Sequence, residues 1–406
     1  MTTSTTAYVT AGPDGLRLDG KPYYIVGTNF WHGMNLSAVT EWGGDRARLD
    51  DELAELKVAG INCLRIMAGS EGPSEEPYRM KPPMMEKPRE YNEEVLVGLD
   101  YFMEGIRKNG MTAIVTMTNF WHWSGGLSQY VSWATGENPP YPPSYDEPGQ
   151  KEPAACGTWE TYPKWTERFY TNDVVMNRRN SVNGLVYKED PTILAWEICN
   201  EPQIPPFEWI NSIAGFMKSQ NPKQLVTSGI EGKHGKADFD ACHSSKHIDF
   251  TTCHCWVENW EIYDPADPSP KALQDAVDYV TKFINTCSQW SQELGKPLVM
   301  EEFGMARDAF MGPRYEYSTP TTHRDEYYKK IFEKVEQLEK EGKMSGEAFW
   351  AWGGHGQPRG PLNKFGCRWV GDPPHETPGW YSVSSGDQST LKVLSEHAQR
   401  VNDMRQ

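Results

Sequence analysis

The stretch TILAWEICNEP occupies residues 192–202 and decides the fold. Its first seven residues are apolar and β-compatible except for Glu197, so we expect a short buried strand. Pro202 ends this strand, because proline cannot donate to a β-ladder and disfavours the helical conformation in the residue before it. An amide and a carboxylate, Asn200 and Glu201, therefore stand at its C-terminal end. An α/β barrel carries its catalytic groups at such a place, and an ordinary acidic turn is the alternative.

Seven further segments have the composition of short buried strands, and they alternate with helical segments. The eight predicted strands are residues 23–27, 61–67, 111–117, 192–198, 225–228, 248–254, 297–301 and 346–352. The predicted helices are residues 46–59, 93–108, 165–180, 207–219, 270–294, 323–341 and 388–402. Eight alternating units predict a (β/α)8 barrel with a parallel sheet and outer helices. A doubly wound open sheet is the alternative, but no Gly-x-Gly-x-x-Gly motif follows the first strand.

We expect a single domain over residues 1–406, because no linker or shift in composition divides the chain. Two glycine-containing turns predict a short N-terminal hairpin around residues 12–22. Residues 124–162 and 353–380 are rich in Gly, Pro and aromatic residues and interrupt the alternation. We expect them to form long functional loops at the C-terminal face of the barrel.

The composition narrows the class of ligand. The net charge is −16, from 40 basic and 56 acidic residues. This charge argues against binding to nucleic acid or to an anionic membrane surface. The 16 Trp residues favour aromatic platforms for a neutral polar ligand such as a carbohydrate. No run of 18 apolar residues predicts a membrane span.

The N-terminal residues lack a hydrophobic signal core. We expect a secreted protein whose leader is absent from this chain, with a cytoplasmic protein as the alternative, and we expect a monomer. The eight Cys are scattered at a density far below that of a disulfide scaffold. Cys253-His254-Cys255 resembles a metal-binding fragment, but strand alternation places the His opposite both Cys. We therefore expect neither a metal nor an organic cofactor.

Polar or aromatic side chains follow nearly every predicted strand. They are Trp31, Arg65, Trp121, Asn200, Glu201, Glu231, His254, Trp256, Glu302 and Trp350. Alone, each has an ordinary structural explanation, such as a rim ion pair for Arg65 or core packing for Trp350. Their coincidence at one end of a barrel predicts a site. Two carboxylates, on strands four and seven, point to glycoside hydrolysis, in which one protonates the leaving oxygen while the other attacks or activates water.

Several motifs resemble glycoside hydrolase family 5, a retaining family of eight-stranded barrels, and within it the β-mannanase branch. The motifs are Asn200-Glu201-Pro202, Glu302-Phe303-Gly304, Gly60-Ile61-Asn62 with Arg65, His254, Trp350, Thr118-Asn119-Phe120-Trp121 and Trp256-Val257-Glu258-Asn259-Trp260. The resemblance covers about residues 20–395. It implies retaining endo-hydrolysis of β-1,4-mannosidic linkages in mannan, glucomannan or galactomannan. An exo-acting β-mannosidase with loops that block one end of the cleft is the first alternative, and a non-catalytic carbohydrate-binding barrel is the second.

The resemblance also implies roles for residues. Glu201 is similar to the general acid/base and Glu302 to the nucleophile of the family. Arg65 and His254 are expected to support these two carboxylates, Asn200 to hold the 2-hydroxyl of the reacting sugar, and Trp350 to lie beneath that sugar. Trp31, Trp121 and Trp256 are expected to bind substrate or to support the site. By strand alternation, Glu301 is expected to face away from the site, and Glu197 to be a buried hydrogen-bonded partner. The chain departs from the family at Trp256, where a Tyr is frequent, and at Gln203, where mannanases usually carry Arg.

Overall fold

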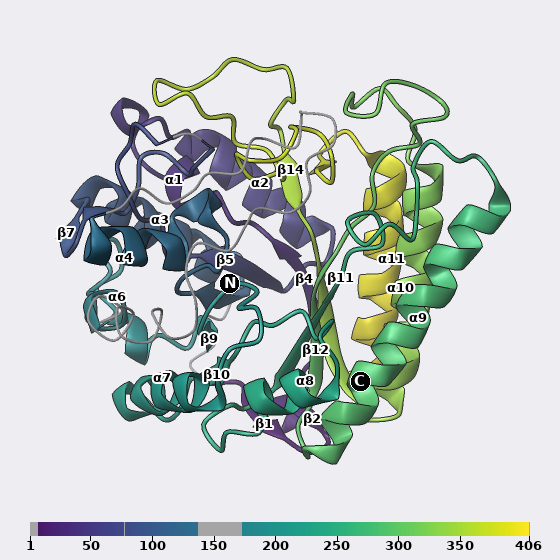
Figure 1. The fold of residues 1–406 in the computed structure, drawn as a ribbon, viewed down its shortest axis with the longest axis horizontal. Helices are drawn as coiled ribbons and strands as arrows, with labels where there is room; N and C mark the ends of the chain where they lie inside the picture. Colours follow the sequence, from purple (N-terminus) through teal and green to yellow (C-terminus); the bar gives the residue numbers. More distant parts are fainter. Residues whose placement is uncertain (1–6, 77, 137–172, 406) are drawn as a thin grey trace.

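The computed structural model describes residues 7–76, 78–136 and 173–405. Its central sheet has eight parallel strands in the order β10-β9-β8-β5-β4-β13-β12-β11 (Figure 1). Their bounds are β4 Ile25–Asn29, β5 Cys63–Met67, β8 Thr112–Thr116, β9 Ile193–Glu197, β10 Leu225–Thr227, β11 Thr251–Cys255, β12 Leu298–Phe303 and β13 Met344–Phe349. The sequence prediction of a (β/α)8 barrel is confirmed.

Individual hydrogen bonds join β10 to β11 and so close the barrel. The Asp249 N–H donates to the Val226 carbonyl at 2.9 Å, and the His254 N–H donates to the Glu231 carbonyl at 3.0 Å. Between them, the Thr227 hydroxyl donates to the Phe250 carbonyl at 3.0 Å. These bonds place the loop after β10 directly beside β11.

Helices surround the barrel, and most agree with the predicted segments. They are α2 Arg46–Val58, α3 Glu93–Lys108, α7 Phe207–Gln220, α8 Lys236–His243, α9 Pro270–Glu293, α10 Thr322–Lys340 and α11 Gln388–Met404. Side-chain caps fix several starts: Asp45 accepts from the Arg48 N–H, and Ser269 accepts from the Ala272 N–H. Of the predicted helix 165–180, residues 165–172 lie outside the described residues, and α6 covers Asp173–Asn177, three residues short of the predicted end. The short helix α8 was not predicted.

The N-terminal residues form a three-stranded antiparallel sheet of β1 Thr10–Gly12, β2 Gly15–Leu18 and β3 Lys21–Pro22. This confirms the predicted turns around residues 12–22. Leu16 is buried against the first residues of the barrel strands, and its N–H donates to the Ser345 hydroxyl at 3.0 Å. The sheet therefore covers the N-terminal end of the barrel, at the bottom of Figure 1.

The two segments predicted as long loops contain more structure than expected. Within the first lies α4, Gly126–Thr135, and residues 137–162 lie outside the described residues. A buried carboxylate anchors this helix, since Glu71 accepts from the Gly126 N–H at 2.9 Å and the Tyr130 hydroxyl at 2.8 Å. At the ends of the second predicted loop, residues 353–380, β14 Trp352–Gly354 pairs with β15 Val383–Ser384. The loop between them is therefore tied at both ends.

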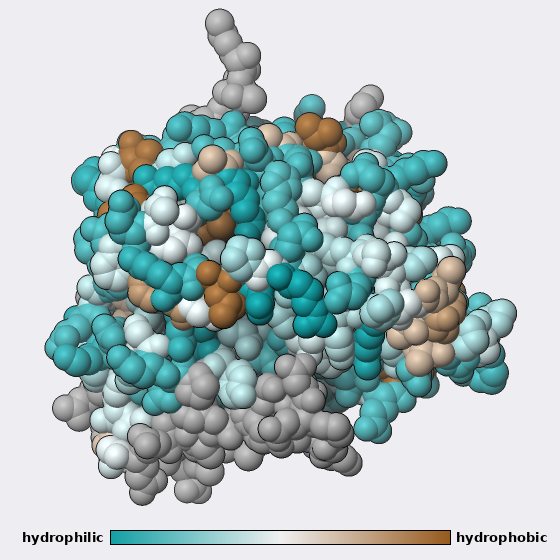
Figure 2. All heavy atoms as spheres, turned by 90° about the horizontal axis from the view of Figure 1, so that it is seen from above, coloured by the Kyte–Doolittle hydropathy of each residue, from teal (hydrophilic) through white to brown (hydrophobic). Residues whose placement is uncertain are grey.

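The remaining short elements lie in the connections. They are α1 Gly33–Leu36, η1 Thr40–Trp42, β6 Met85–Lys87, β7 Glu90–Tyr91, η2 His122–Ser124 and η3 Tyr187–Glu189. Among the described residues, no helix combines the length and apolarity needed to cross a bilayer. On the face shown in Figure 2, hydrophilic residues dominate and hydrophobic ones form small separate patches. The seven Cys of the described ranges are buried and unpaired.

Candidate active site

A pocket opens among the C-terminal ends of the strands, as predicted for this fold. Glu201 and Glu302 both line it, together with Asn200 and Trp350. The two carboxylates are almost entirely buried, at 7% and 2% exposure. The site is therefore shielded from solvent, so its charged groups interact more strongly than they would in water.

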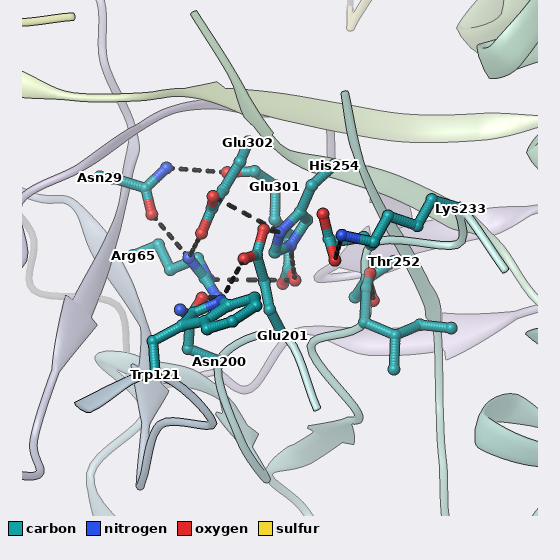
Figure 3. A network of polar contacts seen from close by, with 12 residues as sticks. Asn29, Arg65, Trp121, Asn200, Glu201, Lys233, Thr252, His254, Glu301 and Glu302 are labelled. Carbon is teal, nitrogen blue, oxygen red and sulfur yellow. Dashed lines mark hydrogen bonds and ion pairs between the residues drawn. The ribbon is translucent and has the colours of Figure 1, made fainter. Parts of the chain in front are cut away.

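The guanidinium of Arg65, from β5, lies at the centre of the polar network below the pocket (Figure 3). Its Nε and Nη2 donate to the two oxygens of Glu197 at 2.7 and 2.6 Å. Nη2 also donates to Oδ1 of Asn200 at 2.7 Å, and Nη1 donates to Oδ1 of Asn29 at 2.9 Å and to Oε1 of Glu302. One buried cation thus orients the nucleophile candidate and the neighbouring amide together. Glu197 is the buried partner that the sequence predicted.

His254, from β11, lies between the two catalytic candidates. Its Nδ1 is 2.7 Å from Oε1 of Glu201 and 3.5 Å from Oε2 of Glu302, and its Nε2 is 3.6 Å from Oε2 of Glu301. Burial lowers the pKa of His254, but the charges of Glu302 and Glu201, the hydrogen bond to Glu201 and the nearby carboxylate of Glu301 outweigh it and raise that pKa well above its usual value. His254 therefore carries a positive charge between the carboxylates.

Glu201 has an unusual backbone, with φ at +49°. Non-glycine residues rarely adopt this conformation unless their surroundings hold them there. The Glu201 N–H donates to the Gly229 carbonyl at 2.9 Å, and Nε1 of Trp121 donates to its Oε2 at 2.7 Å. A Cβ at Gly229 would lie 2.2 Å from the Cys199 carbonyl oxygen, so only glycine allows this close approach. Trp121 is therefore a hydrogen-bonding partner of the acid as well as part of the pocket wall.

The prediction that Glu301 faces away from the site is wrong. The pairing of β11 with β12 shifts register between Cys253 and His254, so that Cys253 pairs with Met300 and His254 with Glu302. Glu301 is the extra residue of this β-bulge, and a bulge breaks the alternation of side chains. The Glu301 carboxylate lies beneath the site instead, 3.9 Å from Nε of Arg65.

The protonation of Glu201 and Glu302 is coupled through His254. Burial and the charge of Glu201 raise the pKa of Glu302 to about 8, against the opposing charges of His254 and Arg65. Burial also acts to raise the pKa of Glu201, but the hydrogen bond and charge of His254 outweigh it and lower that pKa to about 2. With His254 charged, the proton of the pair rests on Glu302. Transfer of this proton to Glu201 leaves the net charge unchanged and leaves Glu302 ionised against Arg65.

The aromatic residues predicted for the site divide into two groups. Trp121, Trp256 and Trp350 line the pocket. Trp31 is 2% exposed, donates from Nε1 to the Gly371 carbonyl at 2.7 Å, and packs edge to face against Trp123. It does not line the pocket and lies behind the wall, so its place fits the supporting role among the two expected from the sequence. The side chain at the end of the first strand that does reach the network is that of Asn29.

Other residues of the pocket were given no individual role from the sequence. They are Trp123, Glu231, Lys233, Asn259, Trp260, Pro373, His375 and Glu376. The position of Glu231 in the sequence could have indicated its place in the pocket, because it follows β10 at the same distance as Glu201 follows β9. The last three lie in a Gly- and Pro-rich loop, where no periodicity indicates which side chains point inward.

Among the described residues, Glu201, His254 and Glu302 offer ligand atoms that lie within 4.8 Å of one another. Metal ligation requires a neutral imidazole. The raised pKa of His254 and the ion pair of Arg65 with Glu302 already balance the carboxylates with positive charge. The residues thus fit an acid–nucleophile pair better than a cation site.

A (β/α)8 barrel with two facing carboxylates at its mouth has the arrangement of a glycoside hydrolase. The glycoside hydrolase family 5 β-mannosidase-like model matches residues 6–406, and the chain belongs to this family. It is 45% identical to a family 5 mannosidase of known crystal structure from Rhizomucor miehei, with a TM-score of 0.89 and coverage of 98% of this chain and 99% of the other.

Mannan endo-1,4-β-mannosidases are also similar to the chain. Mannan endo-1,4-beta-mannosidase 4 of Solanum lycopersicum is 29% identical over 358 residues, covering 82% of this chain and 80% of the relative. The putative mannan endo-1,4-beta-mannosidase 9 of Oryza sativa subsp. japonica is 27% identical over 357 residues, covering 82% and 78%. The protein is therefore a family 5 glycosidase of the mannanase and mannosidase type.

The bond from Trp121 to Glu201 predicts a change in pH dependence. The N–H stabilises the ionised carboxylate, so Trp121→Phe raises the pKa of Glu201. Because Glu201 has the lower pKa of the pair, its protonation sets the acid limb of the kcat/KM profile. We expect this acid limb to move to higher pH by roughly one unit, as befits loss of one hydrogen bond to a charged group. Trp42→Phe is the control, because Trp42 stacks on Phe365 instead of lining the pocket. A limb that stays in place, or moves to lower pH, contradicts the assignment.

Proposed function

We propose that the protein hydrolyses β-1,4-mannosidic linkages with retention, through a covalent glycosyl-enzyme on Glu302 and with Glu201 as acid and base. The spacing of the carboxylates carries this proposal: an oxygen of each lies within 4.8 Å of the other. Retaining glycosidases place the two groups about 5–5.5 Å apart, whereas inverting ones leave about 6.5–9.5 Å for a water. Direct attack by a carboxylate is the reaction that this short spacing favours.

The mechanism needs Glu201 protonated and Glu302 ionised when the sugar is bound. Arg65 donates directly to Glu302 and stabilises the anion there. Nδ1 of His254 reaches both carboxylates, so its proton can turn from Glu201 towards Glu302 as Glu201 takes up the shared proton. Glu201 then protonates the glycosidic oxygen while Glu302 attacks the anomeric carbon. In the second step Glu201 removes a proton from water, which releases the sugar.

Features of the loop after β13 favour attack at a chain end. Asp372 holds this loop, since its carboxylate accepts from the Gly379 and Tyr381 N–H groups at 2.6 Å each. The loop places Glu376, which is partly buried, in the pocket wall, and its buried Oε2 has no hydrogen-bond partner among the described residues. A buried polar atom without a partner is costly, and a sugar hydroxyl would satisfy it. We therefore favour the exo mode, with the non-reducing mannose bound against Glu376.

The endo mode expected from the sequence is the second candidate. It is favoured by the similarity to curated mannan endo-1,4-β-mannosidases over 82% of this chain. The substrate in either mode is a mannan-type polysaccharide or manno-oligosaccharide. Secretion, the monomeric state and the lack of a cofactor remain predictions.

Azide rescue tests the two catalytic roles. We expect Glu201→Ala and Glu302→Ala each to lower kcat on mannobiose by at least about 10²-fold, the usual contribution of such a group. With 2,4-dinitrophenyl β-mannoside and azide, Glu201→Ala should yield β-mannosyl azide, because azide attacks the glycosyl-enzyme. Glu302→Ala should yield the α-azide by direct displacement. Nuclear magnetic resonance of the products reads both outcomes.

The control is Glu208→Gln, at an exposed position on α7, which should keep full activity. If the two azide configurations are exchanged between the variants, the roles are reversed. If the unmodified enzyme releases α-mannose first, the reaction inverts and the double displacement is refuted.

The time course on mannohexaose with a chemically reduced end separates the two modes of attack. For exo action we expect free mannose and reduced mannopentaose to appear first, because the terminal mannose would bind against Glu376 of the loop after β13. Chromatography of early samples measures this. Early release of mannobiose, mannotriose and mannotetraose would instead establish the endo mode.

A further inference from the structure

The backbone that follows the catalytic acid is strained at two places. Glu201 has φ at +49° and Ile204 has φ at +50°. For a β-branched residue such as Ile204 this conformation is a clear outlier. Ile204 is also 58% exposed, so tight packing of its side chain does not hold it there. Another group must fix the stretch from Glu201 to Ile204.

The side chain of Gln203 is that group. Its Nε2 donates to the Glu201 carbonyl at 2.8 Å and to Oε2 of Glu231 at 2.7 Å. Its Oε1 accepts from Nε2 of His234 at 2.8 Å. Gln203 thus ties the loop after β9 to the loop after β10. We call Gln203, Glu231 and His234 the acid clamp.

The acid clamp is anchored in the barrel. Glu231 is 4% exposed, and Nζ of Lys233 lies 2.9 Å from the same Oε2 that Gln203 contacts. The Glu231 carbonyl accepts from the N–H of His254, whose ring contacts the Glu201 carboxylate. The acid is therefore held at its backbone by Gln203 and at its carboxylate by His254.

Gln203 does not belong to the pocket wall formed by the described residues, although Glu231 and Lys233 do. The position of Gln203 therefore suits a role in holding Glu201 better than a role in binding substrate. We propose that Gln203 is a positioning residue for Glu201: its amide fixes the backbone that aims the acid at the glycosidic oxygen. This inference rests on the proposed role of Glu201 as the acid.

Leaving-group dependence tests the inference. Mannobiose expels a sugar alkoxide that needs a proton, whereas 2,4-dinitrophenyl β-mannoside expels a stable phenolate that does not. The ratio kcat/KM reports the first chemical step, in which Glu201 acts as acid. We expect Gln203→Met, which keeps the side-chain length and removes the amide, to lower kcat/KM on mannobiose at least about tenfold, part of the usual contribution of a general acid. On the dinitrophenyl substrate we expect a change of less than about twofold, because no acid is needed there.

Two other variants are compared with Gln203→Met on the same two substrates. Glu201→Ala should show the same selectivity between the two substrates, only larger, and Glu208→Gln should show none. If Glu201→Ala loses both substrates equally, the proposed role of the acid fails. If Glu201→Ala is selective but Gln203→Met loses both substrates equally, or raises only KM on mannobiose, the positioning role of Gln203 is overturned. Should Gln203→Met fail to fold, Gln203→Leu takes its place, since it also removes the amide, adds no charge beside Glu231 and stays close in volume.

Discussion

The buried guanidinium of Arg65 is the constraint on which the active site depends. Glu197 and Glu302 each lie within hydrogen-bonding distance of it, and Glu301 is 3.9 Å away, all nearly excluded from solvent. Removing one partner of a buried ion pair costs about 3–5 kcal/mol, because the other charge is left uncompensated. Its two-pronged bond to Glu197 fixes the plane of the guanidinium. The rest of the guanidinium then points at Glu302 and Asn200. In this way an ion pair between β5 and β9 orients the proposed nucleophile on β12.

The same charge balance explains how one site holds both an acid and a nucleophile. Arg65 and His254 supply two positive charges near two carboxylates that cannot both ionise without cost. His254 lies beside both, so the proton of the pair can pass from Glu302 to Glu201 next to the same cation. The barrel contributes rigidity: Arg65, His254 and Glu302 lie within strands, and only Glu201 lies beyond the end of one. This explains why Glu201 alone needs a strained backbone and additional bonds from Gln203 and Trp121.

Much of this arrangement follows from the sequence. Buried apolar strands that alternate with helices predict the barrel, and polar residues after strand ends predict Arg65, Glu201, His254 and Glu302. The prediction failed where local rules are overridden. Alternation misplaced Glu301, because a bulge in β12 depends on the pairing with β11. The position after the first strand left the role of Trp31 open, and packing against Trp123 places it behind the pocket wall.

The helix α4 and the pocket residues His375 and Glu376 were missed for a related reason. Glycine and proline signal an irregular chain, and they do not say which side chains tertiary contacts direct inward. The buried carboxylates of Glu71 and Asp372 organise these segments. Such interactions join residues far apart in the sequence, so no local pattern reveals them.

Trapping the glycosyl-enzyme tests the central claim most directly. The protein is incubated with 2-deoxy-2-fluoro-β-mannosyl fluoride, which slows the second step, and the peptides are then analysed by mass spectrometry. The account predicts one fluoromannosyl adduct, on the carboxylate of Glu302. An adduct on Glu201 or Glu301, or complete turnover of the reagent with inversion and no adduct, would contradict it.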